Sequence, residues 1–401
     1  MDDTKYWLWL ALVFGNSSSR LWQVMCVFET ASEAYYELCA DCRMFELTDR
    51  EKNSIKSTSL HHAEEIIENC GKKGIRIIGY SSEKYPSKIR CIFNPPAVLY
   101  YKGNIDCLCG TKTITAVGTR NASAYALYTA DRVCSELADN GVVIVSGFAV
   151  GIDIKSHLSA VSRKKPTVCV LGCGIDVNYP NENFRYRDMI LDSGGVFISE
   201  FHMGTRAFGT NFPRRNRVLS ALGHATVVFQ ASLTSGSIIT ANLAAEQGRE
   251  VFCLPPPDIF SYEYSGNTEL LRSGALPLFS ANDISAYLDI ESPAIPDEWT
   301  EKAKKKSRKT DGIKNLQEHD EKSVEISNNI IMGNSYSVKD FSEFEGVQND
   351  IMKLLSGGAV HADVIANKLN LNPTDLMTEL TELEIIGAVN SLPGKMFEIK
   401  S

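Results

Sequence analysis

The alternation of short apolar runs with amphipathic segments between residues 111 and 290 is the feature that most constrains the fold. Segments with helical periodicity, such as 124–141 and 235–248, separate runs that are rich in β-branched residues. Strands that are apolar on both faces and alternate with helices are typical of a parallel sheet covered on both sides. The pattern therefore predicts an α/β domain with a Rossmann-like, doubly wound, mostly parallel sheet. The predicted strands lie in ITAVG (114–118), VVIVSG (142–147), TVCVLGCG (167–174), GVFISE (195–200), ATVVFQA (225–231) and EVFCLPP (250–256).

The chain of 401 residues is too long for one ordinary core, and the segment before this pattern differs from it. Residues 1–73 carry apolar residues at helical spacing, which predicts an N-terminal helical domain. Two further short strands are predicted at Ile75–Tyr80 and Ala97–Tyr101, so we expect the sheet domain to span 74–290.

The segment that follows the sheet domain, residues 291–342, is charged and has few residues that could pack in a core. This composition predicts a disordered linker. Its basic run, Lys302–Lys309, is either a solvated tether or an aid to anion binding.

The C-terminal segment 343–401 contains three helical patterns followed by a hairpin pattern around Pro393-Gly394, which predicts a winged-helix domain. The third helical pattern has no Lys or Arg, and its acidic residues are Asp375, Glu379, Glu382 and Glu384. A recognition helix of that charge repels phosphate. We therefore expect a module for protein contact or self-contact, or a winged helix without a partner, rather than a reader of duplex DNA.

The segment NFPRRNR (211–217) concentrates positive charge in a chain whose formal net charge is −8. An acidic protein is not a general coat for nucleic acid, so an anionic partner must be held by a local patch. Between Glu200 and Glu246 there is no acidic residue. The cationic or titratable residues of this window include Arg206, Arg214, Arg215, Arg217, His202 and His224.

Arginine side chains bind phosphate through two parallel hydrogen bonds, and Asn211 and Asn216 add donors and acceptors beside them. Phe212 offers a ring on which a base could stack. The structural alternative is an arginine that pairs with Glu200 or Asp153, which does not easily explain all three arginines. The composition of the segment therefore favours an anionic ligand.

Ligands of doubly wound sheets bind outside the carboxyl ends of the strands. Four segments that follow predicted strands should converge there: Thr119–Asn121, Phe148–Asp153, an irregular stretch that contains NFPRRNR, and Leu233–Ser237.

Ser235, Gly236 and Ser237 lie at a predicted helix start, where backbone N–H groups, two hydroxyls and the helix dipole suit phosphate. Capping of the helix by serine is the structural alternative. Gly147 and Gly151 flank a second strand-to-helix turn of the same kind.

The sequence gives no sign of catalysis or of a bound cofactor. It contains no GxxxxGK[ST], GxGxxG, HExxH or GxSxG motif in a suitable context. Glu200 and Asp153 are the acids near the expected site, and lone acids among glycines are more typical of structural hydrogen-bond acceptors. We predict no catalytic residue and no cofactor.

The 11 cysteines are odd in number and scattered, which suits a reducing cytoplasm. Cys39 and Cys42 form a CxxC with His61 and His62 further on, but a zinc site would need a second spaced pair, so thiols packed near a helical core are favoured over metal. The N-terminus lacks the basic start of a signal peptide, and no apolar run is long enough to span a membrane.

The motifs of the central region resemble those of the DNA-processing protein A family, also called Smf. The matching stretches are KYPSKIRCIFNPPAVLYYKGN (84–104), VGTRNASAYA (117–126), SGFAVGIDIKSH (146–157), VLGCGIDVNYPNEN (170–183), ISEFHMGT (198–205), NFPRRNRVLSAL (211–222), SGSIITANLAAEQGREVFCLP (235–255) and SGNTELLRSGA (265–275). Their order and spacing fit over roughly residues 80–290. The N-terminal segment, as a SAM/HhH-like helical domain, and the C-terminal winged helix fit the optional flanking domains of the family.

The resemblance implies a cytoplasmic, non-enzymatic protein that binds single-stranded DNA and forms a homodimer. It implies protection of incoming single strands during natural transformation and loading of a RecA-type recombinase. By motif position, it places Arg120, Ser146, Gly147, Arg214, Arg215, Asn216, Arg217, Ser235, Gly236 and Ser237 along the strand. Gly151, Asn211 and Phe212 complete the candidate site, and Phe184 is a second candidate for base stacking.

Four positions depart from the family pattern. Val150 and Asn181 stand where many members carry a basic residue, which bears on affinity rather than on fold. Gln230 replaces a common Glu, and Pro256 stands where Gly is expected.

Two other functions remain open. A nucleotide sensor or nucleotide N-glycosidase on a related Rossmann-like fold would use the same pocket. A scaffold would use the acidic winged helix as its contact surface.

Overall fold

The computed structural model describes residues 3–41, 45–290, 346–369, 371–385, 388–392 and 396–399. It divides the chain into two compact units, Met1–Lys305 and Lys306–Ser401. The predicted linker 291–342, with its basic run Lys302–Lys309, lies outside the described residues, as does Cys42 of the CxxC.

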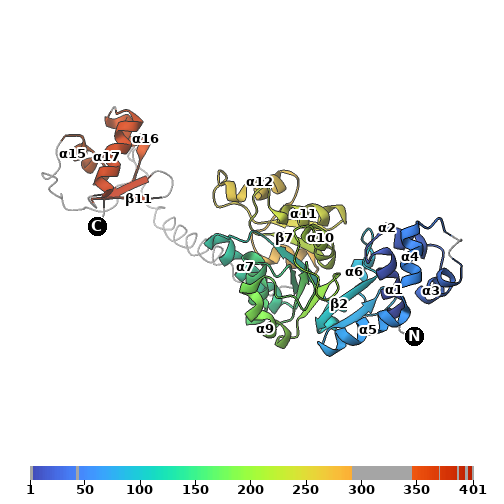
Figure 1. Ribbon diagram of the computed structural model, residues 1–401. Coiled ribbons are helices and arrows are strands. Elements are labelled where there is room, and N and C mark those ends of the chain that lie inside the picture. The colour runs from blue at the N-terminus through green and yellow to red at the C-terminus, as the bar shows by residue number, and fades with distance from the viewer. Residues whose placement is uncertain are drawn as a thin grey trace, which may run out of the picture. The chain divides into compact units, whose positions relative to one another are not determined.

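A nine-stranded sheet with the order β1-β2-β6-β5-β4-β3-β7-β8-β9 forms the centre of the first unit (Figure 1). Strands β3 to β9 run parallel, and β1 and β2 are antiparallel additions at one edge. This confirms the predicted mostly parallel, doubly wound sheet. The strands are β1 (Arg76–Gly79), β2 (Val98–Gly103), β3 (Thr113–Val117), β4 (Val143–Ser146), β5 (Thr167–Leu171), β6 (Val196–Ser199), β7 (Ala225–Val228), β8 (Glu250–Cys253) and β9 (Leu276–Pro277).

The chain reverses its direction across the sheet between β3 and β7. From β3 it winds outward through β4, β5 and β6, and it then returns to place β7 on the other side of β3. Every residue of β3 to β7 is buried, which explains why these strands are apolar runs rather than alternating patterns. The switch point between β3 and β7 is where such folds form a crevice.

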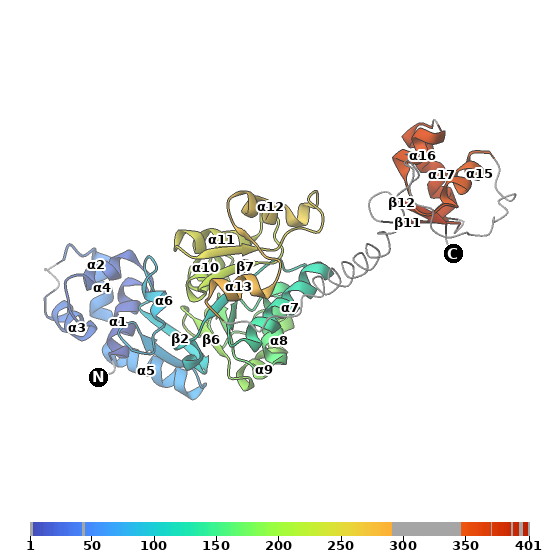
Figure 2. The same ribbon diagram turned by 180° about the vertical axis from the view of Figure 1, so that it is seen from behind.

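Helices cover both faces of the sheet (Figure 2). On one face, buried residues of α10 and α11 pack on Val117, Val145 and Val170, and on the other face α7 and α8 pack on Ile114 and Ile144. The helices are α7 (Ala124–Asp139), α8 (Ile152–Ser162), α9 (Arg187–Asp192), α10 (Asn211–Leu222), α11 (Gly236–Glu246), α12 (Ser265–Arg272) and α13 (Ala281–Tyr287).

Helix α10 corrects one expectation from the sequence. The stretch NFPRRNR was expected to be irregular, but it forms the first two turns of α10, which starts at Asn211. Pro213 is compatible with this because the N–H groups of the first helical turn have no partner within the helix.

The predicted N-terminal helices are present and share a core with the sheet. Buried side chains of these helices, such as Trp9 and Leu21, belong to the same cluster as Val98 of β2 and Leu171 of β5. The segments 1–73 and 74–290 therefore pack as one body within the first unit. The helices of this region are α1 (Thr4–Phe14), α2 (Ser19–Met25), α3 (Ala31–Ala40), α4 (Asp49–Ser57), α5 (Leu60–Lys72) and α6 (Ser87–Arg90).

The second unit contains the winged helix that the sequence predicts. A three-stranded sheet with the order β10-β12-β11 accompanies three helices, and Ile365, Leu380 and Phe397 are among its buried residues. The elements are α15 (Gly346–Leu355), β10 (Val360–His361), α16 (Ala362–Leu369), α17 (Pro373–Ile385), β11 (Val389–Leu392) and β12 (Met396–Ile399). On α17, Asp375, Glu382 and Glu384 are exposed and Glu379 is half-buried.

Within the described parts of the chain, no helix combines the length and apolar character needed to cross a membrane. The same residues contain no cluster of three or more His, Cys, Asp or Glu side chains placed to hold a metal ion. Cys39 is exposed, whereas Cys70, Cys107, Cys134, Cys169, Cys173 and Cys253 are buried.

Candidate nucleic-acid interface

Two adjoining cavities, of about 360 and 290 Å³, lie at the carboxyl edge of the sheet by the switch point. They share Arg120, Ala149, Phe212 and Arg215 in their linings, so we treat them as one groove. The loops after β3, β4 and β7 and the start of α10 all contribute to it. The predicted convergence of separate segments on one edge is therefore confirmed.

The N-terminus of α11 forms one wall of the groove. Ser235 caps the helix, its Oγ accepting a hydrogen bond from the Ser237 N–H at 3.3 Å, and all of Ser235–Ser237 line the larger cavity. At Gly236 no atom lies within 4 Å of the position that a Cβ would take, so a ligand can approach the backbone. The serines therefore cap the helix and face the groove at the same time, and the helix dipole favours an anion there.

The turn between β4 and α8 forms part of the floor. Asp153, in the first turn of α8, accepts a hydrogen bond from the Ala149 N–H at 3.3 Å. At Gly147 an added Cβ would lie 2.5 Å from a guanidinium nitrogen of Arg215 and 2.6 Å from a carboxylate oxygen of Asp153. Glycine is required there because these two side chains occupy the space above it. Gly151 has a φ of 83° and supplies the reversal of the chain before α8.

Arg215 belongs to the floor of the groove rather than to its rim. It is buried, and its guanidinium donates to the carbonyl oxygens of Gly147, at 2.8 Å, and Val170. Burial lowers the pKa of Arg215, although Asp153 opposes the shift. Burial likewise raises the pKa of Asp153 to about 6, against the attraction of Arg215 and its hydrogen bonds. Arg215 therefore neutralises and organises the floor.

An aromatic wall divides the two cavities. The Phe212 ring packs against Tyr179, with ring centroids 5.7 Å apart, and over Gly172, where an added Cβ would come within 2.9 Å of the ring. The exposed guanidinium of Arg120 lies 5.8 Å from the centroid of the Phe212 ring. A flat ring with a neighbouring cation is suited to a nucleobase and its phosphate.

The expectation that the three arginines of NFPRRNR converge is wrong for Arg214 and Arg217, because of the three only Arg215 lines the two cavities. Successive residues of an α-helix are rotated by about 100°, so Arg215 and Arg217 leave α10 in nearly opposite directions. Arg217 forms an ion pair with Glu200 at 2.5 Å and lines neither cavity. The pairing with Glu200, which was a structural alternative for one arginine, accounts for Arg217. Arg215 is buried and is attracted by the charge of Asp153, and its hydrogen bonds go to backbone carbonyl groups and to Asn216.

The third arginine, Arg214, is exposed and lies with its guanidinium carbon 5.6 Å from the centroid of the Phe201 ring. Arg206 and His202 are also exposed. His224, however, lies at the opposite edge of the sheet, just before β7, and accepts a hydrogen bond from the Thr113 N–H. Burial, with the nearby Lys88, lowers the pKa of His224 to about 4. It does not contribute to a positive field at the groove.

The other predicted site residues support the loops and helix starts that form the groove. Asn216 lines the larger cavity and donates to the Gly236 carbonyl at 3.4 Å. Asn211 is buried and donates to the Arg206 carbonyl at 3.2 Å, and Ser146 is buried and donates to the Ala116 carbonyl at 2.6 Å. Neither of these two, nor Gly151, lines the cavities, so they shape the loops from behind.

Tyr179 and Gly172 line the groove although neither was predicted from the sequence. Gly172 directly follows β5, so its position at a carboxyl strand end was a usable signal. Tyr179 lies in a loop, and nothing in its sequence context points to the ring of Phe212. Phe184 is exposed but lines neither cavity, while the departures Val150 and Asn181 both line the smaller one.

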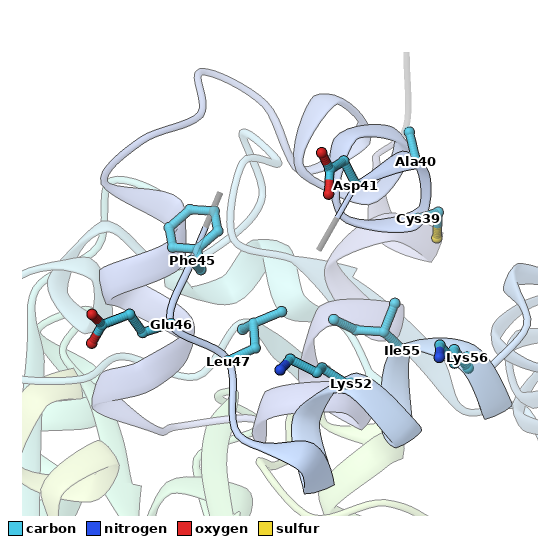
Figure 3. A pocket seen from close by; sticks show the side chains of 9 residues that line it. All are labelled: Cys39, Ala40, Asp41, Phe45, Glu46, Leu47, Lys52, Ile55 and Lys56. Carbon is cyan, nitrogen blue, oxygen red and sulfur yellow. The ribbon is translucent and has the colours of Figure 1, made fainter. Parts of the chain in front are cut away.

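A larger cavity, of about 750 Å³, lies among the N-terminal helices (Figure 3). Phe45, Leu47 and Ile55 line it, with Lys52 and Lys56 of α4. It shares no residue with the groove. Size alone therefore does not identify the functional site.

A doubly wound sheet with a groove at its switch point lined by Arg120, Phe212 and Arg215, in a chain that also contains a winged helix, defines the class of protein. Residues 76–289 match the family described as DNA recombination-mediator protein A, and residues 343–395 match the DprA winged helix domain. The chain belongs to the DNA recombination-mediator protein A family.

Known relatives agree with this assignment. The DNA processing protein DprA of Bacillus subtilis is 38% identical over 213 residues, which cover 53% of this chain and 71% of the relative. Protein Smf of Escherichia coli is 29% identical over 318 residues, covering 79% of this chain and 76% of the relative. The X-ray structure of DNA processing protein A from Streptococcus pneumoniae superposes with a TM-score of 0.62 at 27% identity, covering 71% of this chain and 98% of that one.

Proposed function

We propose that this protein binds single-stranded DNA in the groove and holds it for a RecA-type recombinase. In this proposal it protects strands that enter during natural transformation. Membership in a family described as recombination mediators supports the role, and the groove supplies the means.

The observation that carries the proposal is the meeting of three kinds of group in one groove. Arg120 offers a charge at the rim, Phe212 offers a ring, and Ser235–Ser237 offer a helix N-terminus. Phosphates and bases alternate along a single strand, and these groups match both. In duplex DNA the bases are stacked on each other and cannot reach the ring, so the groove favours single strands.

The proposed role is binding rather than catalysis. Asp153, the buried acid of the groove, is placed under Arg215 and accepts backbone hydrogen bonds. Glu200, the other candidate acid, is paired with Arg217 outside the groove.

We infer a homodimer from two exposed aromatic side chains in the segments that follow β8 and β9. Phe260 and Phe279 are 89% and 79% exposed, and β9 itself contains only two residues. Exposed apolar groups of this size are typical of contact surfaces. Light scattering coupled to size exclusion tests it, and a mass of one chain at micromolar concentration would contradict it.

The binding proposal is tested by titrating labelled oligothymidine and a duplex of equal length at several salt concentrations. If Arg120 and the exposed Arg206 and Arg214 neutralise two or three phosphates, log affinity should fall against log salt with a slope of about −1.4 to −2.1. Equal affinity for the duplex, or no binding, would refute the proposal.

A second candidate function is supported by Asp153, whose raised pKa, about 6, resembles that of an acid catalyst in a cavity of about 360 Å³. This candidate is a nucleotide sensor or a nucleotide N-glycosidase. Incubation with nucleoside monophosphates, followed by chromatography for free base, separates it from the first. Release of base that Asp153→Asn abolishes would favour the enzyme.

A further inference from the structure

Helix α10 is tied to the N-terminal helices on the side that faces away from the groove. Arg217 donates one hydrogen bond to Ser17 Oγ at 2.7 Å and pairs with Glu200 at 2.5 Å. Ser17 in turn donates to the same Glu200 carboxylate oxygen at 2.6 Å. Ser17 lies between α1 and α2, and Glu200 follows β6, so this cluster joins three separate parts of the chain.

The loop 94–96 extends the connection. Its three successive carbonyl groups accept hydrogen bonds from three separate parts of the chain: Asn94 from Arg217 at 2.9 Å, Pro95 from Trp22 Nε1 at 2.9 Å, and Pro96 from the Tyr85 hydroxyl at 2.6 Å. A loop held at every carbonyl in this way has little freedom to move without its partners.

The Asn16 side chain completes the junction beside Ser17. Its amide donates to the carbonyl oxygens of Val98, at 2.9 Å, and Glu200, at 2.8 Å, and its oxygen accepts from the Val98 N–H at 2.9 Å. Asn16 therefore fixes the α1–α2 loop to the end of β6 and the start of β2.

Because it is buried, the ion pair between Glu200 and Arg217 is sensitive to the loss of either partner. The side chain of Glu200 is 2% exposed and that of Arg217 is 18% exposed. Glu200 Oε1 is buried without a hydrogen-bond partner, so the carboxylate depends on Arg217 and Ser17 at its other oxygen. A buried pair of this kind contributes more to a defined arrangement than to net stability, and breaking it leaves an uncompensated charge.

We propose that Ser17, Glu200 and Arg217 form a latch through which the N-terminal helices hold α10 in the position that the groove requires. The inference rests on the proposed function and assigns Arg217 a positioning role instead of a phosphate contact. Because α10 is a rigid helix, a shift at Arg217 moves Phe212 and Arg215 on its other side. The N-terminal helices then contribute to DNA affinity without touching DNA.

Glu200→Gln tests the latch, because it keeps the shape of the side chain and removes the charge. If Arg217 is held as a latch, the variant should bind oligothymidine about two- to thirtyfold more weakly, the range typical of coupled positions. Its salt slope should equal that of the wild type. If Arg217 instead contacts phosphate, removing its competitor Glu200 should leave affinity equal or higher, and Arg217→Gln should reduce the slope by about 0.7.

Three further variants complete the design. Arg120→Met, at the groove, should reduce the slope, whereas Arg163→Met, an exposed cation paired with Asp139 at 3.5 Å, should match the wild type. Ser17→Ala should weaken binding in the same direction as Glu200→Gln.

Hydrogen exchange of the 211–222 amides gives a readout that does not need DNA. Faster exchange in Glu200→Gln than in the wild type supports the latch. Unchanged exchange, or undiminished affinity in the folded variant, overturns it. If the wild type fails to bind single strands, the proposed function falls, and the exchange experiment still decides whether α10 is held by the latch.

Discussion

Replacing Arg120 by methionine is expected to remove one phosphate contact while leaving the fold intact. Arg120 is exposed on the loop after β3, lines both cavities of the groove, and lies over the Phe212 ring at 5.8 Å. Its loss exposes no buried partner, so the free energy of unfolding should change by no more than about 0.5 kcal/mol.

The salt dependence of the affinity follows from the counterions that are released when the protein neutralises phosphates. With three phosphates neutralised, the wild type should lose about eighteenfold in affinity for oligothymidine between 50 and 200 mM salt, and a protein that contacts two should lose about sevenfold. Fluorescence anisotropy at four or more salt concentrations resolves this difference. A matched control is Arg163→Met, which lies at the end of α8 and should keep the wild-type slope.

The reasoning would be refuted if Arg120→Met and Arg163→Met gave the same salt slope. The groove would then be occupied by something other than phosphate, or the strand would run elsewhere on the protein.

Three other changes test separate parts of the account. Phe212→Ala should cost about 1–3 kcal/mol of binding free energy, the contribution of one stacked base. Phe208 is 58% exposed and lies outside both cavities, so Phe208→Ala should bind like the wild type. Equal losses of affinity in the two variants would argue against a base stacked on the Phe212 ring. Gly151→Ala should destabilise the protein by about 1–3 kcal/mol in thermal unfolding, because its φ is 83° and the new Cβ would lie 2.4 Å from a carbonyl oxygen. Gly141→Ala, with a φ of 80° and nothing within 4 Å, should cost about 1 kcal/mol, and a larger cost than at Gly151 would contradict the steric argument. Asp153 has a folded-state pKa of about 6, above its unfolded value. At pH values between these two pKa values, the folded state therefore binds more protons than the unfolded state. The wild type should therefore lose about 2 kcal/mol of stability, relative to Asp153→Asn, as the pH rises from 4 to 6. Parallel pH profiles would show that the pKa of the carboxyl group is not perturbed.

The parts of the fold that the sequence predicts are those in which local pattern and burial agree. Strands β3 to β8 were predictable because burial on both faces demands continuous Val and Ile runs. The winged helix was predictable because its helices and hairpin are short-range units with clear apolar spacing.

Helix α10 could not be predicted from its first residues. The segment 211–217 is polar, contains Pro213 and lacks apolar periodicity, which begins only at Val218. The helix forms there because Val218 and Leu219 pack under the sheet, so tertiary contacts decide what the local sequence leaves open. Once the segment is helical, the side chains of Arg215 and Arg217 must separate, and this is why the expected cluster of three arginines does not form.

The latch was beyond single-sequence reasoning for a different reason. Arg217 meets Asn94 and Ser17, which lie 123 and 200 positions away along the chain. No local pattern records such a pairing, and the acid-free window around Arg217 pointed toward a ligand instead.

Photochemical crosslinking with an oligothymidine that carries single 5-iododeoxyuridines tests the central claim most directly. Excited iodouracil reacts with aromatic side chains in contact with it, and mass spectrometry of the digested adduct locates the residue. The account predicts adducts at Phe212 or Tyr179, lost in Phe212→Ala and competed by unlabelled single strands. Adducts confined to the winged helix or to the amino edge of the sheet, near His224, would contradict it.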